Sequence, residues 1–246
     1  METLTLQVHV EGRWHDAALL TLGDAARGTD SPSTLAYDTN YYFAYGHQAL
    51  AQGCALRDHR AISVRYPLDL ESRRIKTWPP FLLDLLPQGK AKERLCQDLG
   101  IDASSKSAEL PLLVRSAGSP IGNLRVKEAW QKEQERLEGV SIQGVTIDEI
   151  FAHSEVFGDM VDRFALLASG SSGVQGEWPK ILLTQAKDEL FYPDSIVADE
   201  DARAHVIVKM SQAKFPEDQL ILEAEAPYLE LARNFGLRVG APLTHQ

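Results

Sequence analysis

The order of three segments in the last third of the chain constrains the fold more than any other feature of the sequence. The stretch 169–176 contains three glycines and three serines, and a later apolar segment, 205–209, ends at Lys209. A segment typical of a long helix, 217–235, follows. Backbone amides of a glycine-rich turn can cover phosphates, and a strand lysine held by a helix glutamate can contact them. This order is the one that a nucleotide-binding lobe needs.

Each part of this arrangement also has a plainer interpretation. By composition alone, the stretch 169–176 is more often a flexible linker than a phosphate-binding loop, and it matches neither GxxxxGK[ST] nor GxGxxG. Lys209 needs a partner if its ammonium group is buried, whereas a surface lysine extends that group into water. Glu223 and Glu225 both lie in the predicted helix, where exposed glutamates are common. The order of the segments is what favours a binding site.

Composition restricts the class of protein. The chain has 246 residues, of which 44% are hydrophobic and 24% are charged, as is ordinary for a globular protein. A net charge of −10 disfavours direct binding of nucleic acid, which requires clustered basic residues. One small basic cluster is interpreted as a solvated loop and consists of Arg73, Arg74 and Lys76.

The cysteines and the chain's first residues predict a cytoplasmic location. Cys54 and Cys96 have no CxxC spacing, so we expect reduced thiols in a reducing compartment. The first residues alternate between apolar and polar types, unlike a secretory signal peptide. No apolar run approaches the roughly 20 residues of a membrane span, so we expect no contact with a membrane.

Hydrophobic patterns in the front part predict a small α+β unit over residues 1–126. Alternating apolar residues from Leu4 to Val10 predict a half-buried strand, with a turn at 11–13. Further patterns predict strands at 17–22, 41–45, 61–70 and 121–126, and helices from Pro80 to about Leu99, with a break at Pro87–Gly89, and over 107–117. Gly100 is a plausible helix stop.

A charged segment, 127–145, is interpreted as a solvated connector, which can be helical, and as the boundary between two domains. Thr146 and Glu149 then have the spacing of a capping box, which predicts a helix to about His153. The remaining patterns predict a helix over 156–168, a hairpin of strands 181–184 and 189–192, a strand over 204–210, a helix ending before Gly236 and a last strand from 237. We therefore predict a second domain over 146–246.

Other chemistries find little support in the sequence. A GxSxG motif is absent, so a hydrolase nucleophile elbow is not indicated. The seven histidines show no HExxH or HxH spacing, and we predict no metal site.

At this point the residues resemble those of a known family. The chain resembles the HipA family of serine/threonine kinase toxins from bacterial toxin–antitoxin systems, over nearly its whole length. In the front part the resemblance rests on PLDL (67–70), PPFLLDLLPQG (79–89), LGI (99–101) and SPIGNLRV (119–126). In the back part it rests on SSGVQGEWPK (171–180), HVIVK (205–209) and YLELARNFGL (228–237).

The resemblance implies a small N-terminal subdomain followed by a kinase N-lobe with a glycine-rich loop over ATP. It implies that Lys209 contacts the ATP phosphates and that Glu225 is its helix partner. The other residues implied to line the phosphates are Ser172, Gly173, Val174, Gln175 and Lys180. The family's loop also contains a serine that becomes autophosphorylated, and the candidates here are Ser169, Ser171 and Ser172.

One departure from the family concerns catalysis. After Lys209 the only aspartate is Asp218, whereas the family needs a catalytic aspartate and another that holds Mg²⁺. We expect both to lie beyond Gln246, so that no catalytic residue and no metal ligand falls within this chain and the chain alone is inactive. The full enzyme would phosphorylate a serine of a protein, typically an aminoacyl-tRNA synthetase, and a HipB-like DNA-binding antitoxin would neutralise it. The alternative is a non-catalytic regulatory or partner-binding module.

Overall fold

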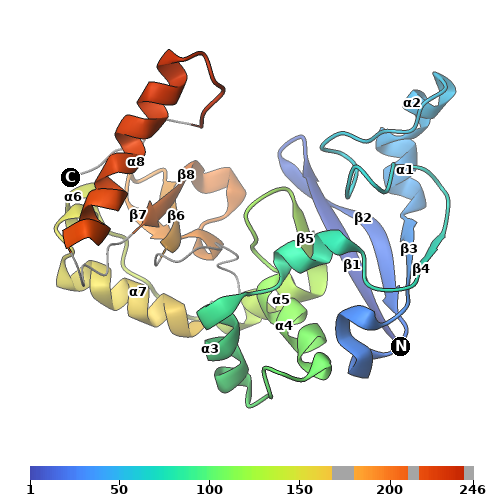
Figure 1. The fold of residues 1–246 in the computed structure, drawn as a ribbon, viewed down its shortest axis with the longest axis horizontal. Helices are drawn as coiled ribbons and strands as arrows, with labels where there is room; N and C mark the ends of the chain where they lie inside the picture. Colours follow the sequence, from blue (N-terminus) through green and yellow to red (C-terminus); the bar gives the residue numbers. More distant parts are fainter. Residues whose placement is uncertain (168–179, 210–215, 241–246) are drawn as a thin grey trace.

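The protein consists of helices and two antiparallel sheets, which confirms the predicted α+β class. The computed structural model describes residues 1–167, 180–209 and 216–240. Figure 1 shows a five-stranded sheet towards one end of the molecule and a three-stranded sheet with helix α8 towards the other. Helices α4 and α5 lie between them.

The larger sheet has the order β4-β3-β2-β1-β5, and all of its neighbouring strands are antiparallel. Leu4, Leu6, Val8 and Val10 of β1 are buried, as their alternation predicted. The predicted turn is present, with positive φ at Glu11 and Gly12. The strands are β1 (Glu2–Val10), β2 (Arg13–Leu22), β3 (Ser33–Tyr37), β4 (Arg73–Ile75) and β5 (Leu124–Val126).

Helices cover one face of this sheet and complete its core. Leu113 and Ala117, at the end of α4, and Ala129 of α5 are buried in the same cluster as Leu6 and Leu20. The predicted helices before Gly100 and around 107–117 are confirmed, and Gly100 ends α3 with a φ of 65°. The elements are η1 (Ala25–Asp30), η2 (Pro80–Leu85), α3 (Gly89–Leu99), η3 (Lys106–Ala108), α4 (Glu109–Ser116) and α5 (Lys127–Leu137).

Two strand predictions in this part were wrong. The segment 41–45 belongs to helix α1 (Thr39–Tyr45), because the Asp38 carboxylate accepts a hydrogen bond from the Tyr41 amide and caps the helix. A short helix, α2 (His47–Ala51), follows it. The segment 61–70 forms no strand and makes only isolated bridges, such as the one between Leu56 and Leu68.

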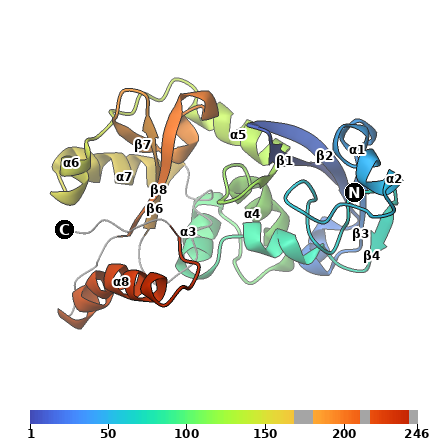
Figure 2. The same ribbon diagram turned by 90° about the horizontal axis from the view of Figure 1, so that it is seen from above.

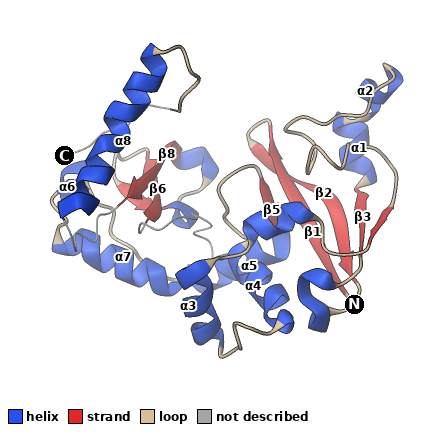
Figure 3. Ribbon diagram, in the orientation of Figure 1, coloured by secondary structure: helices blue, strands red, loops and turns tan. Residues whose placement is uncertain are grey.

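The smaller sheet has the order β7-β6-β8 (Figure 3). Its hairpin of β6 (Lys180–Ala186) and β7 (Phe191–Pro193) was predicted, and so was β8 (Ala202–Lys209). The 3-10 turns η4 (Asp194–Ile196) and η5 (Asp199–Asp201) connect β7 to β8. Leu183 of β6 is buried against Phe157 and Met160 of a helix that precedes the sheet.

The helices of this part are α6 (Ile147–Phe151), α7 (Glu155–Leu167) and α8 (Pro216–Asn234). The capping box is confirmed, since Thr146 accepts from the Glu149 amide while the Glu149 carboxylate accepts from the Thr146 amide. Gly236 follows α8 with a φ of 76°, as expected of a helix stop. The strand predicted from residue 237 was wrong, because residues 237–240 have no regular structure.

Helix α5 is more than a solvated connector. It lies between the two sheets (Figure 2), and its residues Ala129, Glu133 and Leu137 are buried. The Glu128 carboxylate accepts a hydrogen bond from the Thr5 amide of β1. After the helix, Val145 pairs with Phe191 of the smaller sheet. The charged segment therefore packs as part of the fold, while the predicted domain boundaries stay a prediction.

Both cysteines are free thiols, as expected. Among the described residues, no helix is long and apolar enough to cross a membrane.

Candidate functional site

Two lysines lie side by side at one end of the smaller sheet. The register of β6 and β8 places Lys180 directly opposite Lys209. Residues that face each other across an antiparallel pair project from the same face of the sheet. In β8 the residues Val206 and Val208 pack on the hydrophobic core, and the alternation of the strand puts Lys209 on the opposite face. Both lysines therefore project from the face that does not cover this core.

Helix α8 supplies a carboxylate to this pair. The Lys209 ammonium donates a hydrogen bond to Glu225 and forms an ion pair with it. Like charges directly opposite each other in a sheet are unfavourable, so the Glu225 carboxylate offsets the repulsion between the two ammonium groups. Each partner keeps about a third of its side chain exposed, and the pair is worth less for stability than for fixing the position of Lys209.

The sequence left two glutamates open as partners of the lysine, and the structure distinguishes them. Glu225 contacts Lys209, whereas the Glu223 carboxylate accepts a hydrogen bond from Gln219 one turn earlier in α8. The predicted roles of these residues in ATP binding stay predictions.

The other predicted phosphate-binding residues precede this site in the chain. Lys180 is the first residue of β6 and follows the glycine-rich segment 169–176 after three residues, so the segment precedes in the chain the end of the sheet that carries the two lysines. The residues Ser169, Ser171, Ser172, Gly173, Val174 and Gln175 lie outside the described residues.

Farther along the same face, three side chains form a network that the sequence analysis missed. The Thr184 hydroxyl donates to Asp194 over 2.6 Å, and His205 Nδ1 lies 2.9 Å from both of these groups. If the single hydroxyl proton goes to Asp194, the His205 Nδ1–H is the donor in the contact between His205 and Asp194. The only signal in the sequence was the outward position of His205 in an alternating strand.

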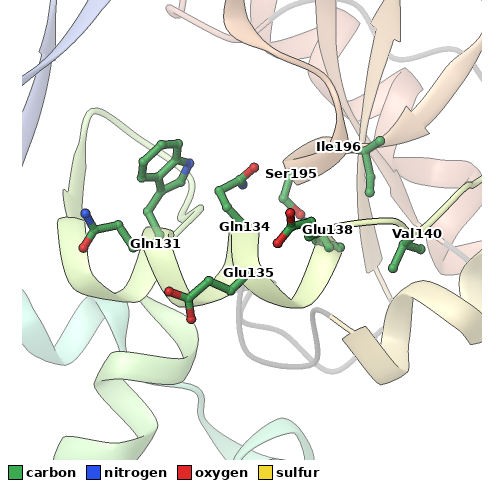
Figure 4. A pocket seen from close by; sticks show the side chains of 9 residues that line it. Gln131, Gln134, Glu135, Glu138, Val140, Ser195 and Ile196 are labelled. Carbon is green, nitrogen blue, oxygen red and sulfur yellow. The ribbon is translucent and has the colours of Figure 1, made fainter.

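A cavity of about 680 Å³ separates the smaller sheet from the N-terminal part. One wall comes from the β1–β2 hairpin, β5 and α5, and the other comes from η4, η5 and the edge strand β8. The Trp14 indole N–H donates to Asp199 over 3.1 Å and bridges the two walls. A neighbouring cavity of about 750 Å³ lies between α5 and η4, where Gln134 and Glu138 point toward Ser195 and Ile196 (Figure 4).

Arg125 of β5 is the most unusual residue of this cleft. Only 9% of it is exposed, and its guanidinium carbon lies 4.1 Å from the ring centre of Trp14 and 4.4 Å from that of Trp130. Removal from water lowers its pKa to about 10, against the attraction of Asp199 and other carboxylates. The resemblance included Arg125 in a motif but gave it no role, because its tryptophan contacts arise only in the fold.

Comparison with known families concerns the front part of the chain. The family described as the HipA N-terminal domain matches residues 31–127. This segment is similar to the HipA N-terminal domain. The match supports the resemblance to the HipA family, including its toxin–antitoxin association in general, through the front part of the chain. It includes β3, β4, β5 and α4, whereas β1, β2 and the smaller sheet lie outside it. No curated protein matches the chain.

Proposed function

We propose that this chain forms the nucleotide-binding part of a HipA-like serine/threonine kinase, in which Lys209 contacts the α- and β-phosphates of ATP. The ion pair between Lys209 and Glu225 carries this proposal. A lysine on a strand, held by a glutamate of the following helix, is the arrangement by which protein kinases position ATP. The glycine-rich segment 169–176 precedes β6 by three residues and would supply the amides that cover the phosphates.

In this proposal the chain binds ATP without completing the reaction. Asp218 is the only aspartate after Lys209, so the catalytic aspartate and the Mg²⁺ ligands come from outside these residues. The complete kinase transfers the γ-phosphate to a serine of a protein, with an aminoacyl-tRNA synthetase as the expected substrate and a HipB-like antitoxin as the partner. Phosphate on Ser169, Ser171 or Ser172 would add negative charge close to Lys180 and rearrange the loop.

The proposal predicts that Lys209→Ala lowers the affinity for MgATP by about tenfold or more, because a charged hydrogen bond to phosphate is lost. Glu225→Gln should weaken binding less, since the lysine remains but loses its ionic partner. Isothermal titration calorimetry measures both effects. Lys187→Ala is the matched control, because Lys187 lies in the same hairpin and pairs with Asp201 at the surface. Equal affinities of Lys209→Ala and the unmodified chain would refute the role of Lys209.

Activity provides a separate check on the catalytic part of the proposal. The chain incubated alone with MgATP is expected to incorporate no phosphate, because it lacks the catalytic aspartate. Intact-mass spectrometry measures this directly. A mass gain of one phosphate on a loop serine would show that the catalytic groups lie within these residues.

A second candidate function is that of a partner-binding module without catalysis. It is favoured by apolar side chains that lie exposed on and just after α8, namely Leu220, Ile221, Tyr228, Leu231, Phe235 and Leu237. Such a cluster is typical of a surface that another protein covers. A chain whose melting temperature does not respond to MgATP, and whose affinity for an antitoxin is unchanged by Lys209→Ala, would favour this candidate over the first.

A further inference from the structure

We propose that the cleft between the two sheets binds a small carboxylic acid with an apolar body, whose carboxylate pairs with the guanidinium of Arg125. This site uses neither Lys209 nor Glu225 and does not depend on the proposed kinase function. The proposal rests on the geometry of Arg125, on the hydrogen bonds of the acidic groups around it and on the residues that line the cavity.

A chain of hydrogen bonds fixes the orientation of Arg125. Its Nε donates to Gln7 Oε1 over 2.8 Å, and Gln7 Nε2 in turn donates to Asp16 Oδ1 over 2.7 Å. Asp16 also accepts from the Lys127 ammonium over 2.6 Å. The contacts with the rings of Trp14 and Trp130 hold the guanidinium from its sides. The arginine is therefore held in one position before any ligand arrives, which favours binding.

The guanidinium has no direct ionic partner within the described part of the chain. There, its only hydrogen bond is the one from Nε to Gln7, and no carboxylate lies within ion-pair distance of it. A buried charge without a partner is unfavourable, and the lowered pKa of Arg125 reflects that removal from water. The Nη groups remain as a pair of donors that matches the two oxygens of a carboxylate.

Two of the three acidic residues that line the cleft are already engaged with other groups, and the third, Glu200, forms no ion pair with Arg125 among the described residues. Asp199 accepts from the Trp14 indole and lies 3.8 Å from His9 Nε2. Asp194 accepts from Thr184 and contacts His205. Since neither carboxylate is free to turn toward Arg125, an anion from outside the chain is the natural partner of the guanidinium.

The surroundings favour a monoanion with an apolar body. The carboxylates of Asp194, Asp199 and Glu200 line the cavity with a single arginine, so a doubly charged phosphate would meet stronger repulsion than a carboxylate. A cavity of about 680 Å³ suits a small molecule. Its apolar lining includes Pro120, Ile121, Leu182, Ile196, Val197 and Ile207.

A second unpartnered group lies in the same cavity. The Ser195 hydroxyl is buried and has no hydrogen-bond partner in the structure as described, and Ser195 lines both this cavity and the neighbouring one in Figure 4. Buried hydroxyl groups are normally hydrogen-bonded. Rotation of the Ser195 side chain toward the cavity would let a polar ligand atom provide that partner.

The test uses 3-phenylpropionate as the probe, with 3-phenylpropionamide and phenyl phosphate as its matched neutral and dianionic analogues. We expect 3-phenylpropionate to shift the indole N–H resonances of Trp14 and Trp130 saturably in NMR spectra of the full chain. The amide should bind about tenfold more weakly or worse, because it lacks the charge that pairs with Arg125. Tighter binding of phenyl phosphate, or no saturable shift with 3-phenylpropionate at millimolar concentration, would overturn the proposal.

Two variants locate the probe. Arg125→Lys keeps the charge but removes the paired donors, and should weaken binding about tenfold. Ile207→Trp fills the cavity from a half-exposed position and should abolish binding without lowering the melting temperature, so the test survives if the arginine variant fails to fold. Arg203→Lys is the control for Arg125→Lys, because it makes the same change at a solvent-exposed arginine that pairs with Glu189. Arg203 lies on β8, the strand that also carries Ile207. Unchanged binding in Ile207→Trp would contradict the site.

Lys209→Ala separates this site from the proposed nucleotide site. It should leave the affinity for 3-phenylpropionate unchanged while it removes binding of MgATP. If the unmodified chain binds 3-phenylpropionate but not MgATP, the kinase proposal is refuted and the carboxylate site is supported. Displacement of 3-phenylpropionate by MgATP in the unmodified chain would show that the cleft is part of the nucleotide site, and would overturn the inference of a separate one.

Discussion

Replacing Leu20 with alanine is expected to lower the free energy of unfolding by about 2–5 kcal/mol, the usual range for a fully buried leucine. Leu20 of β2 lies opposite Leu4 of β1 and Leu35 of β3, and all three side chains are buried. Alanine would leave a cavity in the largest hydrophobic core of the protein, and the surrounding strands can collapse into it only partly. Urea denaturation followed by circular dichroism measures the loss.

Leu19→Ala provides the matched control for this experiment. Leu19 precedes Leu20 in the same strand, but its side chain projects from the other face of the sheet and is 49% exposed. Leu19→Ala should lower the free energy of unfolding by less than about 1 kcal/mol, because a half-exposed leucine contributes less buried apolar surface than Leu20 does. A larger loss for Leu19→Ala than for Leu20→Ala would mean that the register of β2 is shifted by one residue.

Predictions from the sequence were most accurate where a pattern of apolar or charged residues extends along a single strand or helix. Alternation in β1 was sufficient, because one face of that strand is buried along its whole length. The partner of Lys209 could be narrowed to two residues, since Glu223 and Glu225 follow it within one helix. The structure was needed to decide between them, because the choice depends on how α8 is rotated against the end of β8.

The failures have local physical causes. Four of the five residues in 41–45 are aromatic and suggested a strand, but the Asp38 cap stabilises a helix there and outweighs that preference. The segment 61–70 alternates like a strand, yet the Tyr37 hydroxyl holds it by donating to the Tyr66 carbonyl and accepting from the Ile62 amide. A side chain more than twenty residues away thus determines this conformation, and no local pattern contains that information.

The cleft could not have been predicted from the sequence for the same reason. The residues that form it and orient its arginine come from five separate elements, namely Gln7, Trp14, Arg125, Trp130 and Ser195. The contacts of Arg125 with Gln7 and Trp14 join residues more than a hundred positions apart. Each of these residues alone has an ordinary interpretation. They indicate a binding site only because the fold brings them together at one cavity.

Gly28→Ala is expected to lower the free energy of unfolding by about 3 kcal/mol or more, because two unfavourable effects coincide. Gly28 has φ 51° and ψ −132°, a conformation that is accessible almost only to glycine. A β-carbon there would lie 2.2 Å from Glu109 Oε2 and 2.3 Å from the Lys106 carbonyl oxygen. Glu109 would have to move, and the hydrogen bond from the Thr29 amide to its carboxylate would be lost.

Gly12→Ala separates the two effects. Gly12 also has a positive φ, 76°, but a β-carbon there would meet no atom within 4 Å, so alanine should cost only about 1 kcal/mol of backbone strain. Thermal and urea denaturation of both variants measure the difference, which reports the close packing of η1 against η3 and the start of α4. Equal losses in the two variants would mean that this contact is looser than the structure indicates. A large excess for Gly28→Ala would establish that a single close approach joins the β2–β3 connection to the helices that cover the sheet.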